Sequence, residues 1–76
     1  MDSHAVVIGN IKTLAEERQL SINRLADSAG VSRSHLAKVL RGVHSPTLAT
    51  LDLIALALGV TTRSLFATSA ATAEHR

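Results

Sequence analysis

The chain has 76 residues and a formal net charge of +2, which is the size of one small domain. It has no cysteine, which excludes a disulfide framework and a thiolate metal site and leaves a regular helical core of aliphatic residues to supply stability. No apolar run approaches the roughly 20 residues that span a bilayer, and no signal-peptide pattern is present, so we expect a cytoplasmic protein without membrane association.

The first predicted element is a helix that begins at Asp2 or Ser3 and runs to about Arg18. Apolar residues recur in it at positions i, i+4 and i+7, which indicates one face turned towards a core. These residues are Val7, Ile11 and Leu14. We expect this helix to serve as scaffold.

Two short amphipathic helical patterns separated by a turn occupy residues 21–42. Ser21 is a candidate N-cap for the first pattern, and Gly30 suits the left-handed conformation that closes it. Ser32 is a candidate N-cap for the second pattern, which runs from 33 to 41. Its apolar residues, Leu36, Val39 and Leu40, leave a small, polar and cationic face on the other side. The stretch therefore predicts a helix-turn-helix.

Positive charge is concentrated on this motif. Three basic residues and no acidic one lie between Asp27 and Asp52, whereas the other five basic and six acidic residues nearly cancel. A cationic surface on one part of a nearly neutral domain is typical of a protein that binds nucleic acid.

A fourth helix is predicted from its cap Thr47 to Leu58, because Pro46 disfavours helix at Ser45 and Gly59 can form the C-cap. One apolar stripe of this helix is expected in the core. It consists of Leu48, Leu51, Ile54, Ala55 and Leu58. A last short helix capped by Thr61 is predicted to follow, so that residues 1–68 form the domain and 69–76 a flexible tail.

The fourth helix also has a second apolar stripe, formed by Ala49, Leu53 and Leu56, where a surface helix normally carries charge. Either the segment 65–73 folds back over this stripe, or the stripe forms a twofold dimer interface together with Leu65 and Phe66. A dimer would place two copies of the third helix about 34 Å apart, one turn of DNA.

Several segments resemble the phage repressor and Cro type of helix-turn-helix regulator, the Xre family. They are IKTLAEERQLS, the Leu25-Ala26 pair, AGVSRSHL, the Arg41-Gly42 pair, SPTLATL and IALALGVTTRSLF. Three positions depart from the family pattern, since Ile22, Arg24 and Leu40 stand where relatives usually carry Gln or Glu. The resemblance implies an all-α fold, a compact five-helix bundle like the lambda-repressor DNA-binding domain, with the helix-turn-helix at helices 2 and 3.

The resemblance also implies that the third helix enters the major groove of DNA. In that arrangement Arg33, Ser34 and Lys38 contact bases, and Ala37 faces the groove, where a small side chain can touch a thymine methyl group. The Arg33 guanidinium can donate to O6 and N7 of one guanine. A solvated helix face is the alternative for Arg33 and Lys38. His35 either contacts a base or phosphate or packs against the second helix.

Phosphate contacts are expected at helix N-termini and in the loop after the third helix, where amides and hydroxyls reach the DNA strand. The candidates are Ser21, Asn23, Ser32, Arg41, His44, Ser45 and Thr47. For Ser21, Ser32 and Thr47 the alternative is helix capping alone. Arg24 is either a further phosphate contact or a surface charge.

Catalysis is not expected, because the chain has no metal-binding H-E-x-x-H spacing and no glycine-rich phosphate loop. No cofactor, metal or small-molecule effector is implied. We expect a transcriptional regulator, most simply a repressor, that binds double-stranded DNA as a homodimer on a palindromic operator. The alternative is an antitoxin or another protein-interaction module that binds a partner such as a toxin and for which DNA binding is secondary.

Overall fold

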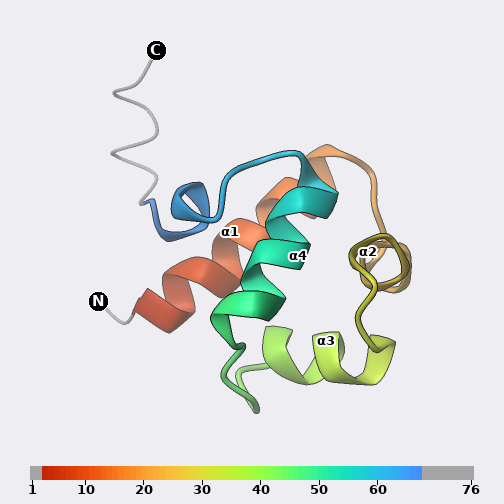
Figure 1. The fold of residues 1–76 in the computed structure, drawn as a ribbon, viewed down its shortest axis with the longest axis horizontal. Coiled ribbons are helices and arrows are strands. Elements are labelled where there is room, and N and C mark those ends of the chain that lie inside the picture. The colour runs from red at the N-terminus through yellow and green to blue at the C-terminus, as the bar shows by residue number, and fades with distance from the viewer. Residues whose placement is uncertain (1–2, 68–76) are drawn as a thin grey trace.

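The computed structural model describes residues 3–67, and these residues form four α-helices and one short 3-10 helix (Figure 1). The elements are α1 (Ser3–Glu17), α2 (Ile22–Ala29), α3 (Arg33–Leu40), α4 (Leu48–Leu58) and the 3-10 helix η1 (Arg63–Phe66). No strand occurs within the described part of the chain, so the all-α prediction is confirmed there. Residues 1–2 and 68–76, including the predicted tail, lie outside the described residues.

The predicted fifth helix is a single 3-10 turn and not an α-helix. Its backbone N–H groups donate to carbonyls three residues back, from Ser64 to Thr61 at 3.1 Å and from Leu65 to Thr62 at 3.0 Å. The Thr61 hydroxyl accepts from the Ser64 N–H at 3.2 Å, as the predicted cap requires. One turn is enough here because it brings Leu65 fully into the core.

Local capping chemistry sets the ends of the other helices. The side chains of Ser21, Ser32 and Thr47 each accept a hydrogen bond, 3.1 Å long, from the backbone N–H three residues later. Gly30 and Gly59 close α2 and α4 in the left-handed conformation, both with φ of 75°. These boundaries were all predicted from the sequence.

Aliphatic side chains from every helix meet in one core. The core consists of Val7, Ile11, Ala15, Leu25, Ala26, Ala29, Leu36, Leu40, Leu51, Ile54, Ala55, Leu58 and Leu65. Leu14, predicted to face inward, is only partly buried and packs against this cluster. None of the described helices has the length and apolar character needed to cross a membrane.

The prediction that Leu48 belongs to the core is wrong, because 65% of this residue is exposed. Leu48 is the first residue of α4, and helical side chains lean towards the N-terminus of their helix. Its side chain therefore projects beyond the part of α4 that packs on the other helices. The remaining predicted core residues of α4 are buried.

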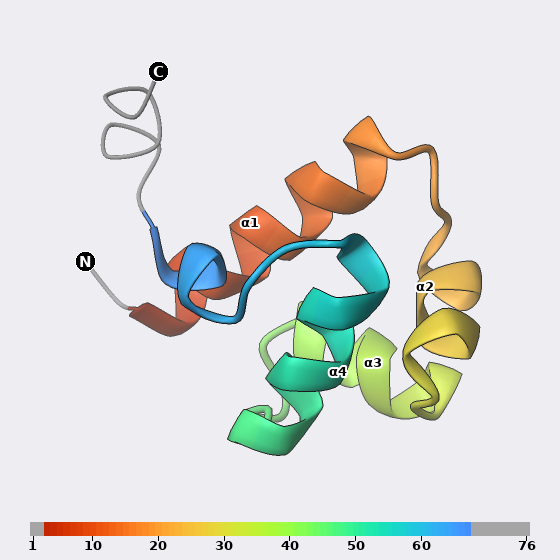
Figure 2. The same cartoon turned by 45° about the horizontal axis from the view of Figure 1, so that its top comes forward.

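The helix pair α2–α3 lies at one end of the molecule and η1 at the other, beside the first half of α1 (Figure 2). The Asn10 side-chain amide joins α1 to η1 by donating to the carbonyls of Leu65 at 2.8 Å and Ala67 at 2.7 Å. The helices α1 and α4 and the turn η1 thus pack on one another, and one long side of α3 stays exposed.

Candidate nucleic-acid interface

The turn between α2 and α3 holds the two helices at a fixed angle. Gly30 takes the left-handed conformation, and the Val31 N–H donates to the carbonyl of Ala26 at 3.0 Å. Val31 packs partly buried against the core, and Ser32 then caps α3. Because both helices bury their apolar faces in the same core, the opposite face of α3 is directed outward.

The outward face of α3 carries the predicted base-contacting residues. Arg33, Ser34 and Lys38 are exposed, and Ala37 is partly buried beside them. At about 100° per residue these four positions fall within one arc of the helix surface, and the position of Arg41 falls near the middle of the same arc. The structure thus brings them together on one surface, while their contacts with bases stay a prediction.

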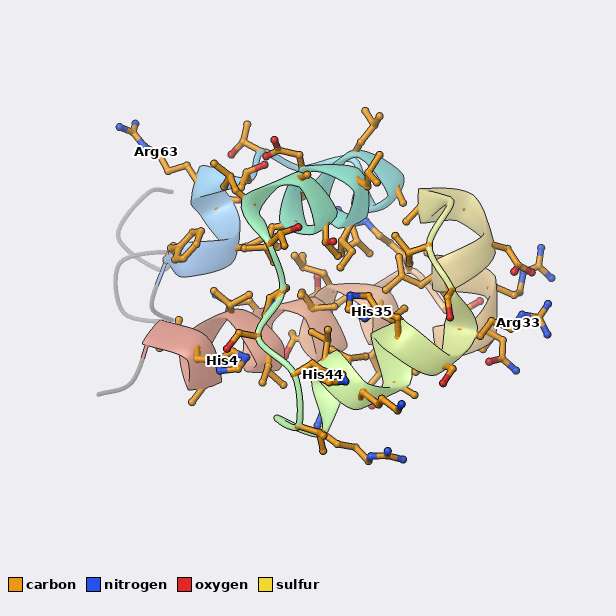
Figure 3. All side chains as sticks on the ribbon, turned by 60° about the horizontal axis from the view of Figure 1, so that its bottom comes forward. His4, Arg33, His35, His44 and Arg63 are labelled. Atoms are coloured by element: carbon orange, nitrogen blue, oxygen red, sulfur yellow. The ribbon has the colours of Figure 1, made fainter. Side chains whose placement is uncertain are left out.

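Arg33 makes an ion pair that sequence reasoning missed. Its Nε donates to Oδ1 of Asp27 at 3.1 Å and its Nη2 donates to Oδ2 at 2.7 Å. The Arg33 side chain points outward from the N-terminal end of α3 (Figure 3), and both partners are more than half exposed. Hydrogen bonding from Arg33 lowers the pKa of Asp27 below its ordinary value, and the carboxylate raises the pKa of Arg33.

An open groove lies between the second half of α1, the start of α2 and the end of α3. Four of the predicted phosphate and base contacts line it, namely Ser21, Asn23, Ala37 and Arg41, together with Lys12 and Glu16. Lys12 was assigned to the scaffold helix and not to the site. The groove combines two cationic side chains with the N-terminus of α2, where the first backbone N–H groups have no partner within the helix.

The predicted phosphate contacts after α3 lie in a loop whose backbone is held to the end of that helix. The Val43 N–H donates to the carbonyl of Lys38 at 2.9 Å. The rings of His35 and His44 stack with their centroids 6.1 Å apart (Figure 3). His35 is partly buried, and the ring on which it stacks belongs to the loop and not to α2. Its contact with a base or phosphate stays a prediction. Ser45 and Thr47 are exposed on either side of Pro46.

The second apolar stripe of α4 is exposed. Leu53 is 42% exposed, Leu56 is 77% exposed and Ala49 is also on the surface. Phe66 of η1 is 45% exposed, whereas Leu65 has no exposed area. Assigning Leu65 to a dimer interface was therefore wrong, because the side chain is used by the core of a single chain. The segment proposed to fold back over the stripe lies mostly outside the described residues.

Two helices joined by a glycine-containing turn, packed on a helical scaffold with the polar face of the second helix outward, define a helix-turn-helix domain. The chain belongs to the helix-turn-helix family HTH_3, which matches residues 11–65. This range runs from the second half of α1 to η1 and includes α2, α3 and α4 in full. The predicted resemblance to regulators of this type is thereby confirmed.

Two curated relatives each match 50 residues, or 66% of this chain, at 44% identity. One is the immunity repressor protein of Bacillus phage phi105, of which the match covers 35%. The other is the HTH-type transcriptional regulator SutR of Escherichia coli K12, of which it covers 28%. The matched part thus spans about a third of the length of each relative.

Solved structures show the same fold. An HTH_3 family transcriptional regulator from Vibrio cholerae matches with a TM-score of 0.77 and 35% identity, over 83% of this chain and 35% of that chain. A hypothetical transcription factor from Neisseria matches with a TM-score of 0.91 over 99% of this chain and 86% of that chain. Its 24% identity supports the fold alone.

Proposed function

We propose that this protein is a transcriptional regulator that binds double-stranded DNA and represses by occupying an operator. The observation that carries the proposal is the outward face of α3, where Arg33, Ser34 and Lys38 are exposed on a helix anchored by its opposite face. A major groove about 12 Å wide admits one such helix. The phage relative is an immunity repressor, which agrees with this proposal.

Base reading and phosphate binding are assigned to different parts of this surface. Arg33, Ser34, Ala37 and Lys38 read bases from the first turns of α3. The groove beside the N-terminus of α2 receives a phosphate, because Lys12 and Arg41 line it together with Ser21 and Asn23. His44, Ser45 and Thr47 reach the backbone from the loop, and His35 positions His44 by stacking on it.

The DNA-binding form is proposed to be a homodimer in which α4 contacts α4 of a second copy. The exposed surface of Leu53 and Leu56 is apolar, and α4 carries a single charged residue, Asp52. Such a face suits an apolar contact between identical surfaces better than a contact with DNA. A twofold pair would let two α3 helices bind both half-sites of a palindrome.

Selection of bound sequences from random duplexes tests the function. A regulator of this kind is expected to enrich one palindromic sequence, and binding to it should weaken steeply as salt rises. Gel shifts on the selected duplex and on a scrambled one of the same composition provide the control. Enrichment of no sequence would contradict the proposal and favour a module that binds a protein partner such as a toxin.

A further inference from the structure

The Asp27–Arg33 pair joins the two helices of the motif across its turn. Asp27 lies in the last turns of α2, and Arg33 is the first residue of α3. Both oxygens of the Asp27 carboxylate accept hydrogen bonds from Arg33, at 3.1 Å from Nε and 2.7 Å from Nη2. This bidentate geometry restrains both the position and the plane of the guanidinium.

The pair leaves the terminal edge of the guanidinium free. A guanidinium has five N–H donors in a rigid planar fork, one on Nε and two on each terminal nitrogen. Asp27 engages the side edge formed by Nε–H and one N–H of Nη2. The terminal edge, formed by Nη1 and the second N–H of Nη2, can still donate two parallel hydrogen bonds to O6 and N7 of a guanine.

We infer that Asp27 is a positioning residue for base readout, which holds Arg33 by its side edge so that its terminal edge is presented to a guanine. A free arginine side chain occupies many rotamers, and binding a base in one of them loses that freedom. Asp27 reduces this loss before DNA binds. The inference rests on the proposed function, because it requires Arg33 to face a base.

The Asp27–Arg33 ion pair contributes little to the folding stability of the domain. Both side chains are more than half exposed, and exposed ion pairs contribute little to folding. The helix ends on either side of the turn are held by other groups, namely Gly30 at the end of α2 and Ser32 at the start of α3. Removing the carboxylate should therefore change base preference far more than it changes the melting temperature.

The test substitutes Asp27→Asn, because an amide offers one acceptor oxygen and cannot receive both hydrogen bonds from the side edge of Arg33. Glu17→Gln is the matched control. The side chain of Glu17 is 63% exposed, and its carboxylate lies 3.8 Å from the Arg18 guanidinium. Glu17 does not line the groove between α1, α2 and α3. Like Asp27→Asn, the Glu17→Gln substitution removes one negative charge beside an arginine, but it leaves the helix-turn-helix unchanged.

Dissociation constants are measured on the selected duplex and on its variants at each base pair, for wild type, Arg33→Ala, Asp27→Asn, Glu17→Gln and the Asp27→Asn/Arg33→Ala double variant. Arg33→Ala identifies the base pair that Arg33 reads. At that base pair we expect Asp27→Asn to lose roughly three- to tenfold of the guanine preference, which is a part of the roughly 5- to 150-fold discrimination that one bidentate contact supplies. The double variant should match Arg33→Ala, since Asp27 then has nothing to position.

Different failures have different meanings. Wild type without preference at any base pair contradicts the proposed function itself. If Arg33→Ala loses a preference that Asp27→Asn retains, the function stands and the positioning role is wrong. If Asp27→Asn binds the selected duplex more tightly than Glu17→Gln and keeps its preference, Asp27 competes with DNA for Arg33, which also overturns the inference. Circular dichroism melting of each variant confirms that folded proteins are compared.

Discussion

The free faces of α3 and α4 differ although both helices are anchored in the same core. On α3 the residues left outside the core include Arg33, Ser34 and Lys38, which are polar or cationic. On α4 they include Leu53 and Leu56, and Leu56 is the most exposed large apolar residue of the described chain. Burial in the core thus explains one side of each helix, and the chemistry of the other side indicates the kind of partner.

In our proposal the polar face of α3 binds DNA and the apolar face of α4 binds a second copy of the chain. A cationic helix gains from phosphates and base edges, which an apolar stripe cannot contact favourably. An apolar stripe gains from removal from water against another apolar surface. Changes confined to one face should therefore affect one kind of binding, and the following experiments test this separation.

The largest effect is expected from reversing the character of the α4 face with Leu53→Lys and Leu56→Glu. Because neither side chain is in the core, the variant should stay folded but sediment as a monomer. Binding to the full operator should weaken roughly 100-fold or more as the linked second half-site is lost, whereas half-site binding should change little. A variant that remains dimeric would place the interface elsewhere, and one that unfolds would show that the stripe is needed within one chain.

Arg33→Ala should produce the next largest effect, and only on the polar face. Losing a bidentate guanine contact should weaken binding to the selected duplex by about 1 to 3 kcal/mol and relax preference at one base pair. Nonspecific binding and sedimentation should stay near wild type. Competition gel shifts with single-base variants measure the change. Equal losses on selected and scrambled duplexes would remove Arg33 from base readout.

Lys12→Ala and Arg41→Ala should weaken binding to all duplexes alike, because both residues line the groove proposed for a phosphate. Each substitution should reduce the slope of log affinity against log salt by about one counterion. Lys12 makes this a sharp test, since it lies on α1 and not on the helix proposed to read bases. An unchanged salt slope in Lys12→Ala would exclude the groove as a phosphate site.

The smallest expected effect comes from the loop after α3, through His44. Its side chain is exposed and its ring stacks on that of His35, and in our proposal it contacts a DNA phosphate. Because a phosphate contact does not depend on base sequence, His44→Ala should weaken binding to the selected and the scrambled duplex alike, by less than Arg41→Ala does. Gel shifts on both duplexes measure the loss.

His35→Ala is the control for that experiment, since the two rings stack on each other. If His44 alone contacts phosphate, His35→Ala should keep most of the wild-type affinity. A loss of affinity in His35→Ala that His44→Ala does not show would transfer the phosphate contact to His35.

Sequence reasoning was most successful where a feature depends on residues within one turn. The caps at Ser21, Ser32 and Thr47, and the closing glycines 30 and 59, were all predicted, because a capping bond joins groups three or four residues apart. The outward position of Arg33 and Lys38 followed from the same helical periodicity. Helix periodicity also identified Leu53 and Leu56 as lying away from the core.

By itself, therefore, the sequence determined the class, the helix ends and the polar face of α3. Only the tertiary structure decided that Lys12 lies across a groove from Arg41, that Leu48 is exposed and Leu65 buried, and that Asp27 holds Arg33. These features depend on how whole helices pack and on the angle at a turn, which helical periodicity does not specify. Two residues six positions apart on different helices meet only after the core has set that angle.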